Sequence, residues 1–460
     1  MLAKLFSLSF LNAWLSIIGV FAAIYLLGVS SVKDEVDLFT ATSKTLVAGF
    51  GIGALGGSTL YVIASKFDSG CSDRSEEIIF AVVFAIQCFF GFVLIISGWF
   101  ISSSLLIDID ALAFLRNIKA EIVVFYILYI VIQPTIDLIT GFLLGTKRFP
   151  VVLRIQIFQK FFNLLGLLAA SFFGVFGFCC LFAAGILITC LWGFYSLDIR
   201  VRARDFLSYE KVSEEMTRLV KMSLPFIILG PAGGVGVLLL YPLVVQHSPG
   251  DLAAFTYAQA AVSICLAALA FPIAEPLIQR ISGIWSGVRD NVEVSKDQIR
   301  TLVLVQGVRQ LSFLLACTLA IALSVLIFGE LVSELLGEKV SSVYASVENP
   351  LLLIVMSMPA QHAALVVNRI MISIDRPWMS AMIPTVSSLV AVAIVMIVFR
   401  LEPNIGALVT FSLLGSVIAA CVSAIVFLYF IGVTRDSGSI GVIFSAVVAL
   451  PLVGMLLVLG

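Results

Sequence analysis

Long apolar stretches separated by short polar segments follow one another along the whole chain of 460 residues. Each stretch reaches about 20 residues, the length that a helix needs to cross the hydrocarbon core of a membrane. The pattern predicts about 13 helices, near residues 8–29, 38–64, 78–106, 121–145, 151–173, 176–197, 222–246, 252–277, 306–328, 350–372, 378–399, 405–433 and 439–459. The predicted fold class is therefore an all-α polytopic membrane protein.

Glycine and proline interrupt two of these stretches. The fifth and sixth helices share one apolar run, and the glycines at 174 and 177 predict a tight turn between them. In the seventh helix, Pro231 within GPAGGVG (230–236) predicts a broken or bent helix.

Composition agrees with a membrane protein and excludes several kinds of site. The chain is 61% hydrophobic and 12% charged, about half the charged fraction of soluble domains, and its mean hydropathy is +1.15. Eight cysteines without a CxxC pair and two histidines do not predict a metal site. The glycine-rich GFGIGALGG lies within a predicted membrane helix with no strand before it, so we expect no nucleotide site there. We expect no cofactor, no ATP-binding motif and no nucleic-acid partner.

Lysine and arginine are concentrated in the N-terminal segment and in the loops after even-numbered helices. Cytoplasmic loops carry such an excess, so the N-terminus is predicted to be cytoplasmic. The basic loop 198–221 divides the chain into a six-helix half at 1–197 and another at 222–433, with an extra terminal helix within 434–460.

The two halves resemble each other faintly. VDLFTATSKTLVAGFGIGAL from Val36 and GDLAAFTYAQAAVSICLAAL from Gly250 both begin near an Asp-Leu pair, and the fourth and tenth helices end in TKRFP (146–150) and IDRP (374–377). Related lobes of this kind commonly bind substrate near the membrane midplane and work by alternating access.

Four segments carry a resemblance to a known superfamily. They are 36–55, DLITGFLLGTKRFPVVLRIQIFQKFFNLLG (137–166), GDLAAFTYAQAAVSICLAALAFPIAEPL (250–277) and PAQHAALVVNRIMISIDRPWMSAMIP (359–384). Together they resemble the MATE-like exporter superfamily (MOP), and within it the MurJ/MviN-like and Wzx-type flippases of lipid-linked glycans. The first helix offers Asn12 and Ser16 where MurJ-like proteins place arginines.

Embedded charges provide the candidate binding residues, because a charge at the centre of a membrane helix costs about 2.5–3.5 kcal/mol on insertion scales. The candidate cations for a pyrophosphate are Lys44, Lys160, Arg369 and Arg154. The alternative is that Lys44, Arg154 and Arg369 reach outward to the membrane interface.

Three carboxylates could couple transport to protons or pair with these cations: Asp37, Asp137 and Glu275. Asp37 either shares a helix face with Lys44 or caps its own helix. Asp137 is either a proton-coupling group or the partner of Lys160. Glu275 could instead form a salt bridge with Arg280. The candidate polar contacts are Asn163, Tyr257, Gln259, His362 and Asn368, with packing as the alternative for His362.

The predicted function is a flippase that translocates a polyprenyl-(pyro)phosphate-linked sugar or oligosaccharide across the cytoplasmic (inner) membrane, either a peptidoglycan precursor or a surface polysaccharide unit. The alternative is a proton- or sodium-coupled drug or metabolite exporter of the MATE type. An enzyme is not expected, because the exterior loops are short. Candidate partners are the lipid-linked glycan, membrane lipids and other polysaccharide-assembly proteins.

Overall fold

The computed structural model describes residues 53–68, 75–104, 120–197, 213–247, 251–269, 271–287, 298–335, 338–399, 404–431 and 437–459, together with positions 11, 12, 15, 18 and 19. These residues are helical apart from short turns, and none of them lies in a strand. The described part of the chain forms two compact units, one up to Pro231 and one from Ala232 onward. The predicted all-α membrane fold is confirmed.

The first unit is built around α5 (Ala120–Gly145), which packs against α3 (Gly53–Asp68), α4 (Ser75–Ser104) and α6 (Phe149–Leu197). Aromatic rings join α4, α5 and α6: Phe80 makes edge contacts with Phe142 and Phe194, at centroid distances of 5.4 and 6.2 Å. Helix α7 (Ser213–Gly233) begins inside the predicted basic linker 198–221 and continues to the boundary between the units.

Helix α6 contains the turn predicted between the fifth and sixth spans. Gly174 has φ 63° and ψ −158°, a region that is essentially restricted to glycine. The two arms, Phe149–Ala169 and Phe176–Leu197, are each long and apolar enough to cross a membrane. The arms pack closely because Gly185 has no side chain: a Cβ there would lie 2.3 Å from Cβ of Phe162.

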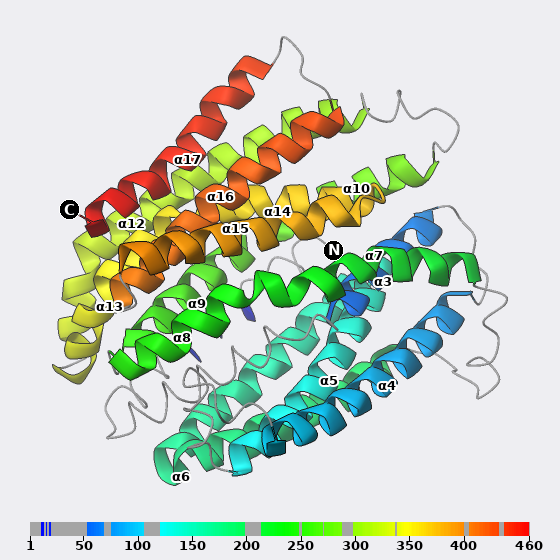
Figure 1. Cartoon of the computed structure of the whole chain (residues 1–460), viewed down its shortest axis with the longest axis horizontal. Helices are drawn as coiled ribbons and strands as arrows, with labels where there is room; N and C mark the ends of the chain where they lie inside the picture. The colour runs from blue at the N-terminus through cyan, green and yellow to red at the C-terminus, as the bar shows by residue number, and fades with distance from the viewer. Residues whose placement is uncertain are drawn as a thin grey trace. The chain divides into compact units, whose positions relative to one another are not determined.

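The second unit comprises α8 (Val235–His247), α9 (Asp251–Leu269), α10 (Phe271–Gly287), the π-helical turn η5 (Val303–Gly307), α12 (Val308–Leu335), α13 (Glu338–Met356), α14 (Met358–Ser373), α15 (Pro377–Val398), α16 (Ile405–Ile431) and α17 (Ser437–Leu459). Helix α16 is at its centre and packs against α9, α13, α14, α15 and α17 (Figure 1). Small side chains allow the closest approach, as at Ala360, Ala420 and Val447, which form one buried cluster.

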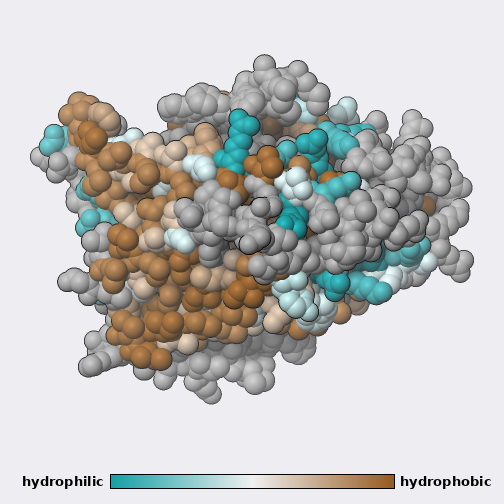
Figure 2. Space-filling view, turned by 90° about the horizontal axis from the view of Figure 1, so that it is seen from above, coloured by the Kyte–Doolittle hydropathy of each residue, from teal (hydrophilic) through white to brown (hydrophobic). Residues whose placement is uncertain are grey.

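The outward side of these helices is apolar. Leu323, Ile327 and Leu331 of α12 are all more than half exposed, and hydrophobic residues cover a broad area of the face seen in Figure 2. Among the described residues, five helices are long and apolar enough to span a membrane, or six if one bent pair is a single span. The other predicted spans stay predictions.

Two of the predicted helices are interrupted in the structure. The expected break near Pro231 is confirmed, since α7 ends at Gly233 and α8 begins at Val235. The predicted tenth span, 350–372, is bent: its two arms, Val347–Met356 and Met358–Ser373, pass together as one apolar span but meet at an angle of 47°. Pro359 lies at the start of the second arm and has no N–H for the helix ladder. The described residues of the eighth predicted span, 252–277, lie in α9 and α10.

The two turns that resemble each other in sequence share one backbone geometry. After α5, the N–H groups of 146, 147 and 148 donate to the carbonyls four, three and five residues earlier, at 3.0, 3.0 and 2.7 Å. After α14, the N–H groups of 374, 375 and 376 repeat this pattern at 3.0, 3.1 and 2.8 Å. Lys147 and Asp375 both take positive φ, 59° and 61°, as a helix C-terminal motif requires. Because many helices end in this motif, the two related lobes stay a prediction.

Candidate functional site

In the first unit, Lys160 belongs to a small polar cluster. Its Nζ donates a 3.1 Å hydrogen bond to the backbone carbonyl of Asn12, and the Asn12 side-chain amide donates to Oε1 of Gln156 at 3.0 Å. Gln156 lies one helical turn before Lys160, and sequence reasoning missed it because it carries no charge. Asn163 is half-buried on the same helix, and Arg154 is exposed.

Asp137 has a different partner. Its carboxylate accepts a 3.1 Å hydrogen bond from Nε2 of Gln133, one turn earlier on α5. The hydrogen bonds of Asp137 and Lys160 thus lead to Gln133 and Asn12 rather than joining the two charges. Asp37 and Lys44 lie outside the described residues, and Glu275 lies in α10 but its side chain is also outside them.

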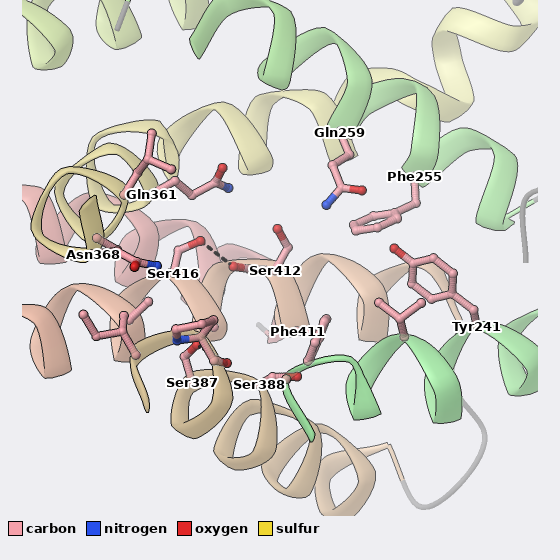
Figure 3. Close-up of a pocket in the computed structure, with 18 residues that line it drawn as sticks. Tyr241, Phe255, Gln259, Gln361, Asn368, Ser387, Ser388, Phe411, Ser412 and Ser416 are labelled. Carbon is pink, nitrogen blue, oxygen red and sulfur yellow. Dashed lines mark hydrogen bonds between the residues drawn. The ribbon is translucent and has the colours of Figure 1, made fainter. Parts of the chain in front are cut away.

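The second unit contains a pocket of about 370 Å³, within the size range of ligand sites. It opens where helices are interrupted or bent: Gly233 ends α7, Pro384 lies within α15, and α14 begins at the 47° bend. Helices α8, α9, α14, α15 and α16 supply the other walls (Figure 3).

Uncharged polar side chains line this pocket. They are Tyr241, Gln259, Gln361, Asn368, Ser387, Ser388, Ser412 and Ser416. Figure 3 shows the amides of Gln259 and Gln361 and the hydroxyls of Tyr241 and Ser412 directed toward the central space. The remaining lining side chains that the structure describes are apolar, including the rings of Phe255 and Phe411, and none of the described lining residues is charged.

Two hydrogen bonds orient amide groups of the pocket. Nε2 of Gln361 donates to Oγ of Ser357 at 2.7 Å, and Ser357 in turn donates to the carbonyl of Ile354 at 2.6 Å. On the next turns of α14, Oδ1 of Asn368 accepts a hydrogen bond from the hydroxyl of Ser380. Since Ser357 lies at the bend between α13 and α14, Gln361 connects the pocket to that bend.

Of the predicted polar contacts, the pocket includes Gln259 and Asn368. Tyr257, His362 and Arg369 lie on the same two helices but do not line it; His362 is 2% exposed and Arg369 is half-buried. Sequence reasoning missed Tyr241, Gln361 and the four serines. The signal that could have found the serines is their spacing, at 387, 388, 412 and 416 within otherwise apolar helices.

Asp251 has a structural role at the end of this unit. As the first residue of α9, it accepts a 2.9 Å hydrogen bond from the backbone N–H of Ile405, the first residue of α16. Asn404 adds a second cap by accepting from the N–H of Ala407 at 3.2 Å. The aspartate of the Asp-Leu pair seen in the sequence therefore links the start of α9 to the start of α16 by a hydrogen bond.

Several solved structures share this fold. A MOP superfamily transporter from Pyrococcus furiosus is 14% identical, with a TM-score of 0.66 over 96% of this chain and 95% of its own. A MATE protein in complex with MaL6 gives 14% identity and 0.68 over 93% and 94%. An outward-facing multidrug resistance MATE family transporter of the MOP superfamily gives 14% and 0.67 over 94% and 96%.

No protein-family model matches the sequence, and no curated protein matches it either. At 14% identity the structural likeness establishes the fold. The chain is a multi-pass membrane protein with the fold of MATE and MOP transporters.

Proposed function

We propose that this protein is a transporter that moves a polyprenyl-(pyro)phosphate-linked sugar or oligosaccharide across the cytoplasmic membrane by alternating access. Transport is supported by the fold, since the similar structures are transporters and the likeness covers nearly the whole of each chain. The observation that carries the choice of substrate is the neutral, hydrogen-bonding pocket of the second unit.

A pocket of amides and hydroxyls fits a sugar better than a cationic drug. Sugar hydroxyls both donate and accept hydrogen bonds, and so do the side chains of Gln259 and Ser412. A drug cation in the same place would lose its hydration and find no carboxylate among the described residues that line the pocket. The neutral lining therefore favours the lipid-linked glycan over a cationic substrate.

The embedded cations are the candidates for the phosphate groups of the carrier. Lys160 uses one of its three N–H donors on Asn12, and the other two have no partner among the described residues, so they can donate to an anion. Arg369 on α14 can bind phosphate through two parallel hydrogen bonds. In this role the protein works in the inner membrane with its N-terminus in the cytoplasm.

A coupled exporter of the MATE type is the second candidate. The observation in its favour is Asp137, a half-buried carboxylate within α5 whose side chain has Gln133 as its hydrogen-bond partner. A carboxylate in such a place can exchange a proton during a transport cycle.

Reconstituted proteoliposomes separate the two functions. We expect a fluorescent polyprenyl-pyrophosphate-linked glycan to change leaflet faster in vesicles with the protein than in protein-free vesicles, and Lys160→Met to slow the movement. Lys221→Met, at an exposed position of α7, is the matched control and should flip at the wild-type rate. Ion-gradient-driven uptake of ethidium without glycan movement would support the exporter and contradict the flippase.

A further inference from the structure

The polar groups of the pocket in the second unit are suited to a ligand, because many of them have no partner within the described part of the protein. The side chains of Tyr241, Gln259 and Ser412 make no hydrogen bond to any described residue, although all three are directed into the pocket (Figure 3). Ser388 lines the same pocket, is 8% exposed, and its Oγ is buried without a partner among the described residues. Buried polar groups are normally satisfied, so a ligand would supply the hydrogen bonds that these groups lack.

We propose that this pocket is a subsite for one uncharged, hydroxyl-rich group, a single sugar ring, held by Gln259, Gln361, Asn368 and Ser388. The proposal deepens the proposed function and rests on it, since it names the part of the lipid-linked glycan that this pocket recognises. It also places the charged carrier phosphates elsewhere, because none of the described residues that line the pocket is a cation.

The existing hydrogen bonds determine which groups of the pocket are left to donate a hydrogen bond to the sugar and which are left to accept one. Gln361 uses its N–H on Ser357, so its carbonyl oxygen is left to accept from a ligand hydroxyl. Asn368 uses its oxygen to accept from Ser380, so its N–H₂ group is left to donate. The hydroxyl of Ser388 can do either. A ligand with donors and acceptors on one small ring matches this arrangement.

Aromatic side chains complete the walls. Tyr241 contacts Phe255 edge-on, with ring centroids 6.3 Å apart and planes at 79°. The ring of Phe411 packs directly on Gly236 of α8. It fits there because glycine has no side chain: a Cβ at position 236 would lie 2.2 Å from Cζ of Phe411. Apolar surfaces with a few placed polar groups are typical of ligand pockets, and here they would cover the C–H faces of a sugar.

Direct binding tests the subsite. The full-length protein in lipid nanodiscs, free of sugar-containing detergents, is titrated by saturation-transfer NMR with N-acetyl-D-glucosamine, D-glucose and D-galactose. Inorganic pyrophosphate and tetraphenylphosphonium serve as the charged probes. We expect at least one neutral sugar to bind and neither charged probe to compete with it.

Variants place the binding in the pocket. Gln259→Leu and Ser388→Ala should each weaken sugar binding about five- to tenfold, the effect of losing one hydrogen bond to a neutral partner. Ser423→Ala is the matched control for Ser388, because Ser423 is also a buried serine of this unit whose hydroxyl has no partner among the described residues, but it lies outside the pocket. Gln259→Glu is a second test that does not depend on apolar packing. Its carboxylate should shift the binding preference of the pocket from the neutral sugar toward the cation tetraphenylphosphonium.

Each result bears on the subsite. Sugar binding that Gln259→Leu weakens and Ser423→Ala does not would support it, even if no lipid-linked glycan is flipped, in which case the flippase function alone fails. Flipping of the glycan by wild type with no neutral sugar bound, or with equal binding by all variants, would overturn the subsite and leave the function standing. Binding of the cation alone would overturn both.

Discussion

A methyl group at position 236 should destabilise the second unit and distort its pocket. An alanine Cβ there would lie 2.2 Å from Cζ and 2.5 Å from Cε2 of Phe411, whereas carbon atoms attract each other at about 3.5–4.0 Å. The ring must therefore move by roughly 1.3 Å. Overpacking costs about 1–3 kcal/mol, and a contact this short belongs at the upper end. Alanine regains about 1 kcal/mol over glycine in a helix, so the net loss for Gly236→Ala is about 2 kcal/mol.

Thermal unfolding of the purified protein, followed by tryptophan fluorescence, measures this loss. For a unit of this size, about 2 kcal/mol lowers the Tm by about 4–8 °C. Because Phe411 lines the pocket, sugar binding should weaken as well. Gly57→Ala is the matched control, since Gly57 is exposed on α3 and a Cβ added there would meet no atom within 4 Å. If Gly236→Ala keeps both the wild-type Tm and the wild-type affinity, the close packing of Phe411 on α8 is refuted.

Three further substitutions test other parts of the structure. Gly174→Ala forces a side chain into a backbone region reserved for glycine and should cost about 1–3 kcal/mol; an unchanged Tm would contradict the turn. Asp251→Ala removes the acceptor for the N–H of Ile405 and should cost about 1 kcal/mol, while Asp251→Asn, which keeps an acceptor oxygen, should lose less; equal losses in thermal unfolding would argue against the cap. Ser357→Ala frees the amide of Gln361 and should weaken sugar binding by about two- to fivefold, because an unfixed side chain must be ordered on binding; wild-type affinity by NMR titration would show that this link does not position Gln361.

Helix interruptions show how far the sequence determines the fold. Glycines at 174 and 177 and the Pro231 segment are local signals, and the structure has a turn and a break at those places. The bend at Ser357 was not predicted, because Met356, Met358 and Pro359 continue an apolar run. Hydropathy reports which residues prefer lipid, whereas the bend depends on a missing backbone N–H and on the hydroxyl of Ser357, which donates to Ile354.

The candidate site was predicted less completely, because embedded charge was the main signal. Charge identified Lys160 and Asp137, whose hydrogen bonds the structure describes. The pocket of the second unit depends instead on neutral residues such as Gln361 and Ser388, which look ordinary in a membrane helix. Only their convergence from separate helices makes them a site, and no local pattern in the sequence reports that convergence. Gln259 was among the predicted polar contacts, and it lines the pocket.

Native mass spectrometry of the protein extracted with its bound lipids is the decisive test of the proposed function. We expect wild type to retain a polyprenyl-(pyro)phosphate-linked glycan and Gln259→Leu to retain much less of it, while Ser423→Ala retains as much as wild type. Retention of an amphiphilic cation in place of the glycan, or equal retention of the glycan by all three proteins, would contradict recognition of a lipid-linked glycan through this pocket.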